Sequence, residues 1–107
     1  MHGLTQIQAA IGAKNAAAFD CTAACSGFVV GVVNAVHLMR GGNFKNVVVI
    51  GGDCLSRYVD WRDRSTCILF GDGCGAVVLT AVEGECNMLG FDVRSDGNLN
   101  KCVCVCV

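Results

Sequence analysis

An apolar run passes into a helical pattern in the segment Phe19-Asp20-Cys21-Thr22-Ala23-Ala24-Cys25-Ser26-Gly27-Phe28. Residues 16–22 are short, apolar and contain an aromatic ring, which predicts a buried strand. From Cys25 to Met39 the large apolar side chains recur every three or four residues, as on one face of a helix. Arg40 and the two glycines after it provide a cationic last turn and a stop. The segment therefore predicts a strand that leads directly into a helix, with Cys25 at the junction.

The flanking segments predict an α/β fold. Residues 4–12 place apolar side chains on one face and end at Gly12, as a short helix does. Val47-Val48-Val49-Ile50 is typical of a central strand, and residues 76–82 and 88–93 predict further strands. Strand, helix and strand at this spacing indicate a right-handed crossover. We therefore expect a mainly parallel sheet with a buried crossover helix.

The composition is unusually apolar for 107 residues. Hydrophobic residues make up 53% of the chain and charged residues 16%, against about 25% charged in an ordinary domain. We expect the excess to pack against another domain or a partner subunit. The net charge of −1, without a basic or acidic block, argues against nucleic acid and anionic membranes as partners. No apolar run reaches the roughly 18 residues of a membrane span, and the N-terminal residues resemble neither a signal nor a transit peptide.

Eight of the nine cysteines fall into two groups. Five lie in or beside apolar runs, and we expect them to be buried free thiols in a reducing compartment: Cys21, Cys25, Cys54, Cys67 and Cys74. The alternating tail 102–107 is interpreted as low complexity, and a soft-metal or redox site there is a weaker alternative. No Cys-x-x-Cys pair occurs, so we predict no metal site.

Cys25 has the surroundings of a nucleophile. The positive end of a helix dipole favours the thiolate, and thiolates are the reactive form of cysteine. Ser26 and Gly27 are small, so an acyl group can approach and backbone N–H groups stay available to an oxyanion. The alternative is a structural cysteine, and the local pattern alone favours that alternative.

Several motifs in a fixed order change this balance. Residues 19–28 closely resemble the active-site segment of β-ketoacyl-acyl carrier protein synthase III, a thiolase-fold condensing enzyme. The resemblance continues through residues 47–53, 55–64 and 68–76, covers roughly residues 4–96, and looks closest to plant plastid and cyanobacterial members. It implies an incomplete thiolase-like fold, part of the N-terminal half-domain, over residues 1–96, with an unmatched tail at 97–107.

The resemblance also implies roles for four residues. Cys25 matches the acylated cysteine, and Arg64 matches an arginine at the coenzyme A entrance. Leu55 and Phe70 match residues beside the acyl pocket. The alternatives are a solvated Arg64 paired with a neighbouring aspartate, Asp60 or Asp63, and simple core packing for the two apolar residues. A glycine-rich turn is expected at 71–75, after an exposed loop at 56–65.

Two residues depart from the family pattern. Ser65 stands where the family usually has glycine, and Cys74 stands where alanine is usual. We expect both changes to be tolerated.

The resemblance implies a decarboxylating condensation of acetyl-coenzyme A with malonyl-acyl carrier protein. Coenzyme A enters as a thioester substrate, and no cofactor is expected. The family draws its catalytic histidine and asparagine from the C-terminal half, and neither His2 nor His37 matches that histidine. The chain alone is therefore expected to be inactive. In the full enzyme a homodimer is expected, in the chloroplast stroma or, alternatively, a bacterial cytoplasm.

Two other functions stay open from the sequence. One is another thiolase-fold synthase, such as a polyketide or hydroxymethylglutaryl-coenzyme A synthase. The other is a truncated, non-catalytic interaction piece whose apolar surface binds a partner.

Overall fold

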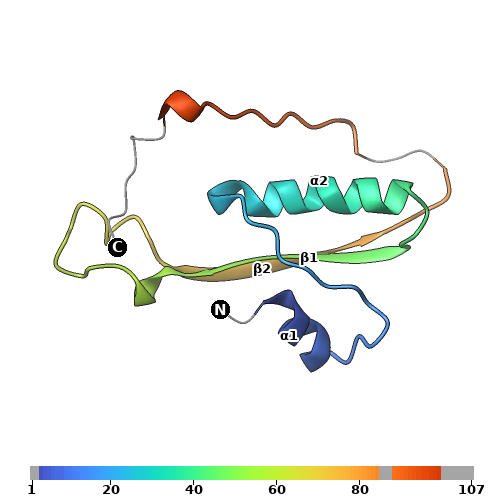
Figure 1. Cartoon of the computed structure of the whole chain (residues 1–107), viewed down its shortest axis with the longest axis horizontal. Helices are drawn as coiled ribbons and strands as arrows, with labels where there is room; N and C mark the ends of the chain where they lie inside the picture. Colours follow the sequence, from blue (N-terminus) through green and yellow to red (C-terminus); the bar gives the residue numbers. More distant parts are fainter. Residues whose placement is uncertain (1–2, 85–87, 100–107) are drawn as a thin grey trace.

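The computed structural model describes residues 3–84 and 88–99 (Figure 1). The elements in chain order are helix α1 (Leu4–Ala10), turn η1 (Ala24–Ser26), helix α2 (Gly27–Arg40), strand β1 (Asn46–Cys54), turn η2 (Leu55–Arg57), strand β2 (Asp72–Thr80) and turn η3 (Gly97–Leu99).

Both predicted helices are confirmed, with ends that the glycines explain. Helix α1 stops just before Gly12, which has a φ of 72°. Helix α2 stops before Gly42, which has a φ of 78°. Glycine adopts this left-handed conformation without the steric cost that other residues have, so each glycine ends its helix.

The prediction of a mainly parallel sheet is wrong within the described residues. Strands β1 and β2 are antiparallel, with Val49 opposite Val77 and Cys54 opposite Asp72. The predicted strand at 16–22 is irregular. An extended segment becomes a strand only by pairing with a neighbour, and without this strand there is no parallel crossover.

Two further strand predictions also need correction. The glycine-rich turn expected at 71–75 lies mostly in β2, which begins at Asp72 and ends at Thr80 rather than Val82. Ladder bonds use the backbone alone, so Gly73 and Gly75 pair there as other residues do, with Asp53 and Gly51. Residues 88–93 form no strand.

Helix α2 lies close against β1 because two glycines leave room for it. A β-carbon on Gly31 would lie 3.0 Å from Cγ1 of Val49, and one on Gly51 would lie 3.1 Å from Cδ2 of Phe28. These contacts place the start of α2 over the carboxyl end of β1 (Figure 1).

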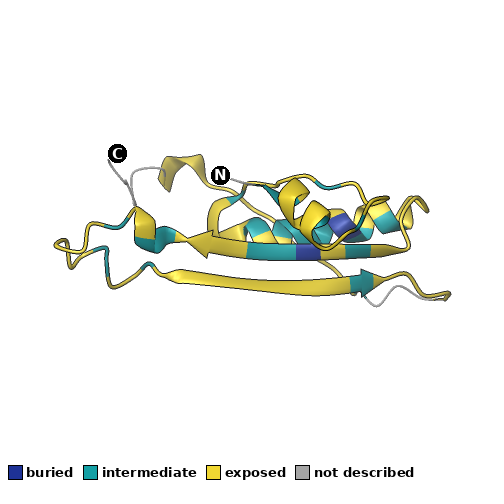
Figure 2. Cartoon of the chain, turned by 90° about the horizontal axis from the view of Figure 1, so that it is seen from below, coloured by how far each residue is buried: buried dark blue, intermediate teal, exposed yellow. Residues whose placement is uncertain are grey.

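The buried part of the described chain is small (Figure 2). Among residues 3–84 and 88–99, only Ala35 of α2 and Val49 of β1 are buried hydrophobic residues. The prediction that the helix is buried is therefore wrong. Helix α2 covers β1 with one face and leaves its other faces exposed. The excess apolar surface expected from the composition is confirmed: Val78, Trp61 and Leu69 are among many large exposed side chains.

The five cysteines predicted to be buried are not. Cys67 is half-buried and the other four are exposed: Cys21, Cys25, Cys54 and Cys74. The cysteines and the apolar residues are exposed for the same reason, which is that the chain is less compact than an ordinary domain. The radius of gyration is 16.9 Å, against about 13 Å for a compact domain of this size, so few residues have neighbours on all sides.

Helix α1 is fixed to the segment that precedes Cys25. The backbone N–H of Leu4 donates to Oδ1 of Asp20 at 3.0 Å. A carboxylate is favourable at a helix start, where N–H groups lack intrahelical partners. A β-carbon on Gly3 would overlap this carboxylate, at 2.0 Å from Oδ2, so a larger residue there requires the Asp20 side chain to shift.

Candidate functional site

Cys25 is the middle residue of η1, immediately before helix α2. The side chain is exposed, as a nucleophile for a large thioester must be. The turn is closed by Ser26 N–H, which donates to the carbonyl of Ala23 at 3.0 Å. The predicted position at a helix start is confirmed, whereas the strand before it is not.

The residue before Cys25 has an unusual backbone conformation. Ala24 has a φ of 45° and is the one residue other than glycine with a positive φ in the described chain. For an L-residue this conformation costs about 1–2 kcal/mol. The sharp bend at Ala24 turns the chain from the irregular segment into η1 and presents Cys25 at the surface.

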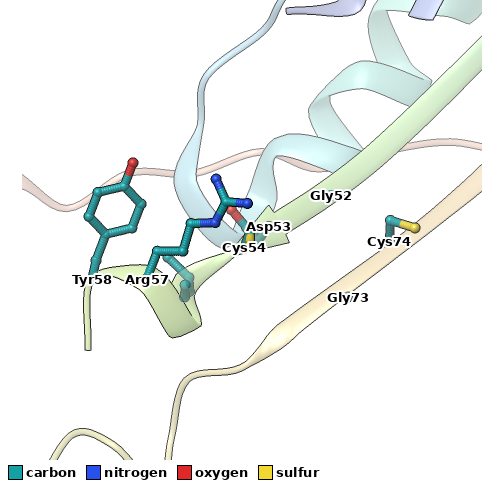
Figure 3. A pocket seen from close by; sticks show the side chains of 8 residues that line it. Gly52, Asp53, Cys54, Arg57, Tyr58, Gly73 and Cys74 are labelled. Carbon is teal, nitrogen blue, oxygen red and sulfur yellow. The ribbon is translucent and has the colours of Figure 1, made fainter. Parts of the chain in front are cut away.

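A hollow of about 570 Å³ lies at the end of the β1–β2 hairpin where the loop between the two strands begins (Figure 3). It is lined by Gly52, Asp53, Cys54, Leu55, Arg57, Tyr58, Gly73 and Cys74. The two strands supply its floor, and η2 with the residue after it supplies an apolar, a cationic and an aromatic side chain.

Asp72 joins the two sides of this hollow. Its Oδ1 accepts the backbone N–H of Ser56 at 2.8 Å, and its Oδ2 accepts the Ser56 hydroxyl at 2.6 Å. The Cys54 thiol donates to Oδ2 at 3.4 Å. The hydrogen bonds from Ser56 hold the pKa of the Asp72 carboxyl below its ordinary value. Turn η2, and Leu55 with it, is thereby tied to the first residue of β2.

A second carboxylate orders the middle of the loop between η2 and β2. Oδ1 of Asp63 accepts the hydroxyl of Ser65 at 2.5 Å and its backbone N–H at 2.9 Å. Oδ2 accepts the Thr66 hydroxyl at 2.8 Å. These bonds, led by the Ser65 hydroxyl, lower the pKa of Asp63.

Arg64 lies in the chain between Asp63 and its partner Ser65. Its side chain is exposed, and within residues 3–84 and 88–99 its guanidinium makes no ion pair or hydrogen bond. Asp60 instead accepts the backbone N–H of Arg62 at 2.9 Å. The alternative of an Arg64 paired with Asp60 or Asp63 is therefore wrong in this structure.

Of the four predicted site residues, one lines this hollow. Leu55 is half-buried and lines the hollow, whereas Cys25, Arg64 and the half-buried Phe70 are outside its lining. The start of α2 faces the same end of the molecule as the carboxyl end of β1 and the loop that follows it (Figure 1).

His37 is engaged elsewhere. It lies in the last turn of α2, with Nδ1 2.8 Å from the carbonyl oxygen of Val33 and its ring centroid 5.3 Å from that of Phe91. At 1.5 Å per residue it is roughly 18 Å along the helix from Cys25. His2 and the tail at 102–107 lie outside the described residues.

The Asp72–Ser56 and Asp63–Ser65 contacts were not predicted. Both are exposed polar contacts in a loop, so no apolar periodicity marks them, and the only signal was aspartate near serine or glycine in a turn. In the described part of the chain, no group of three or more His, Cys, Asp or Glu side chains is arranged to hold a metal ion. No described helix has the length and hydropathy of a membrane span.

Comparison with known proteins shows a consistent similarity. The family model described as 3-Oxoacyl-[acyl-carrier-protein (ACP)] synthase III matches residues 19–97. The Beta-ketoacyl-[acyl-carrier-protein] synthase III of Microcystis aeruginosa is 59% identical over 95 residues, which cover 89% of this chain and 28% of the relative. That of Acaryochloris marina is 58% identical over 98 residues, or 92% of this chain and 29% of the relative.

Solved structures match in the same way. The 3-oxoacyl-(acyl carrier protein) synthase III of Pseudomonas aeruginosa has a TM-score of 0.79 and 41% identity, covering 87% of this chain and 29% of the solved chain. That of Aquifex aeolicus has a TM-score of 0.71 and 52% identity, with 75% and 26% covered. The chain thus spans less than a third of the length of the curated relatives it matches.

Proposed function

Because this chain belongs to the 3-Oxoacyl-[acyl-carrier-protein (ACP)] synthase III family, we propose that it is the cysteine-bearing part of an acyltransferase that starts fatty acid synthesis. The observation that carries the proposal is Cys25, exposed in the turn before α2 and preceded by the bent backbone of Ala24. A thiol at a helix start is the arrangement that nucleophilic catalysis by cysteine uses.

The proposed first half-reaction is an acyl transfer. The Cys25 thiolate attacks the thioester carbonyl of acetyl-coenzyme A, the carbon–sulfur bond to coenzyme A breaks, and coenzyme A leaves as the thiolate. The acetyl group remains on Sγ of Cys25. In this scheme the Arg64 guanidinium binds a coenzyme A phosphate, and Leu55 and Phe70 lie beside the acyl group. Coenzyme A is the thioester substrate, and no separate cofactor takes part.

The second half-reaction is the condensation. Malonyl-acyl carrier protein loses carbon dioxide, and the resulting carbanion attacks the acetyl-Cys25 thioester. Cys25 is expelled as the thiolate and the 3-ketoacyl chain stays on the carrier protein. The family's histidine and asparagine assist the decarboxylation. His37 is engaged with Val33 and Phe91 and cannot supply this role, so we propose that the chain alone does not complete the cycle.

The proposed setting follows the relatives. Residues 1–96 form the partial synthase domain, residues 97–107 lie outside it, and the full enzyme is a homodimer. The two curated relatives named above are cyanobacterial, which favours a bacterial cytoplasm or a plastid of that descent. They do not specifically support a chloroplast stroma.

The proposal is tested by acylation of the chain itself. The chain is incubated with acetyl-coenzyme A, and acetyl thioesters are mapped by mass spectrometry with and without hydroxylamine. We expect one acetyl group on Cys25, absent from Cys25→Ser and retained in Cys54→Ser, a matched variant at another exposed cysteine. Equal labelling of Cys54, or an unlabelled Cys25, contradicts the proposal.

One observation favours a second candidate, a non-catalytic interaction piece. Large apolar side chains are exposed on the sheet and in the loop, among them Val78, Ile68 and Leu69. Such a surface fits a protein partner. A chain that stays monomeric at high concentration and binds no apolar dye contradicts this candidate and leaves the acyl-transfer proposal untouched.

A further inference from the structure

Strand β2 has a free edge. Eight of its nine residues are exposed and Leu79 is half-buried, as the lower arrow of Figure 2 shows. Helix α2 packs on β1, where Gly31 and Gly51 bring the two elements close together, and leaves β2 uncovered. Among residues 3–84 and 88–99, β1 is the one strand that pairs with β2. The backbone N–H and C=O groups on the outer edge of β2 therefore have no partner strand in this part of the chain.

The edge lacks the features that usually keep edge strands from pairing with other chains. Such strands are typically short, or they carry a lysine, a proline or a bulge. Strand β2 has nine residues, contains neither lysine nor proline, and matches β1 residue for residue from Asp72 to Thr80 without a bulge. Its only charge is that of Asp72, at its first position. An edge of this kind is a template for another strand.

The sequence of β2 is complementary to itself when two copies run antiparallel. Small residues dominate the half before Ala76, Asp72-Gly73-Cys74-Gly75, and large residues the half after it, Val77-Val78-Leu79-Thr80. Antiparallel pairing about Ala76 sets the glycines opposite Val77 and Leu79 of the second copy, and Asp72 opposite Thr80. Parallel pairing in register would set the two Asp72 carboxylates side by side, and like charges directly opposite each other are destabilising. The strand therefore fits a second copy of itself in the antiparallel direction.

We propose that β2 is a docking edge for a second copy of this chain, which pairs with it antiparallel about Ala76 and extends the sheet to four strands. The interface is isologous, because each copy offers the same edge to the other. Its affinity comes from backbone hydrogen bonds, as in other complexes formed by strand addition, and its register from the small and large halves of the strand. The assembly does not depend on acyl transfer by Cys25, so either proposal can fail without the other.

Charge substitutions in the full chain test the edge, with the dissociation constant of the dimer measured by sedimentation. Ala76→Lys sets two cations directly opposite each other, and we expect it to weaken dimerisation about fivefold. Thr80→Lys sets each cation opposite Asp72 of the second copy and should tighten the dimer about threefold, whereas Thr80→Glu should weaken it about threefold. Val93→Lys, at an exposed position outside β2, is the matched control and should leave the dissociation constant unchanged.

The two lysine variants of β2 keep this test independent of folding. They add the same charge to the same strand, so a general loss of folding would weaken the dimer in both, whereas the proposed pairing moves them in opposite directions. A chain that is monomeric at every concentration overturns the proposal. A dimer that responds equally to Ala76→Lys and Thr80→Lys overturns it as well.

A cross-link measures the register directly. In Ala76→Cys the two introduced thiols face each other across the two-fold axis, where the α-carbons of opposed residues are about 4.5–5.5 Å apart, within the range that a disulfide spans. Oxidised glutathione, which is reduced to glutathione as the two thiols join, should therefore link two copies at position 76.

The control for the cross-link is Thr80→Cys, whose introduced thiols would lie about 27 Å apart in the same dimer and should not join each other. Mass spectrometry of the linked peptides separates these links from any that join the native cysteines. Linkage at position 76 but not at position 80 is the expected result. Equal linkage at both positions, or none at position 76, overturns the register and with it the proposal.

Discussion

The Asp72 carboxylate accepts both the backbone N–H and the hydroxyl of Ser56, at 2.8 and 2.6 Å, across 16 residues of sequence. The two bonds close the loop between η2 and β2 at its base. This loop carries Arg64, and η2 carries Leu55. The positions of Arg64 and Leu55, two of the three predicted substrate contacts, therefore depend on a carboxylate that hydrogen-bonds to neither.

Removing the Asp72 charge should loosen the loop without unfolding the helices. In Asp72→Asn, amide hydrogen exchange across residues 56–71 is expected to rise severalfold, because an amide accepts hydrogen bonds more weakly than a carboxylate. Asp92→Asn is the matched control, since Asp92 is an exposed aspartate paired with Arg94 outside this loop. Exchange in α2 should be unchanged in both variants. If the exchange of residues 56–71 in Asp72→Asn is the same as in the unmodified chain, the Asp72–Ser56 hydrogen bonds do not order the loop.

The same link should be lost in acid. The pKa values of Asp63 and Asp72 lie below the ordinary 3.8 because hydrogen bonds favour the charged form. A carboxyl with a lowered pKa stabilises the folded loop fully above pH 3.8, and this contribution disappears as pH falls through the lowered values. Carboxyl carbon titrations should show both midpoints below 3.8, and midpoints at or above it would contradict the hydrogen-bond assignment.

Gly31 should tolerate a methyl group poorly. Alanine in a helix interior gains about 1 kcal/mol over glycine, but the new carbon would lie 3.0 Å from Val49 and overpacking costs about 1–3 kcal/mol. We expect Gly31→Ala to lower the free energy of unfolding by about 1 kcal/mol in urea titrations. Asn34→Ala, at an exposed position of the same helix, should not lower it. A more stable Gly31→Ala would mean that α2 moves from β1 without cost.

These contacts also show how far the sequence could predict the fold. The helices were predictable because periodicity and the stops at Gly12 and Gly42 are local signals. The direction of β2 was not, because pairing with β1 joins residues up to 34 apart, such as Asn46 and Thr80. A β-branched run marks a strand but does not identify its partner.

For the candidate site too, local features were predicted correctly and features that depend on other segments were not. The position of Cys25 at a helix start follows from the local pattern, while its role came from resemblance. Burial of the cysteines was predicted wrongly because an apolar flank predicts burial only where other segments cover it. The Asp63–Ser65 contact depends on side-chain rotamers in an exposed loop, which neither periodicity nor propensity encodes.

The strained residue before the nucleophile should respond to glycine. Glycine adopts the φ of 45° seen at Ala24 without steric cost, so Ala24→Gly should raise the free energy of unfolding by up to about 1 kcal/mol. Ala24→Val, with a branched β-carbon, should lower it. Urea titration checks both variants. The bend is not strained if Ala24→Val is as stable as the unmodified chain.

The most direct measurement places this chain in a complete enzyme. The 95 aligned residues replace their counterparts in the Microcystis aeruginosa synthase III, and the chimera is assayed for condensation of acetyl-coenzyme A with malonyl-acyl carrier protein. If Cys25 accepts the acyl group, the chimera is active, Cys25→Ser abolishes its activity and Cys54→Ser retains it. A folded chimera that is inactive, or one that stays active as Cys25→Ser, contradicts the account.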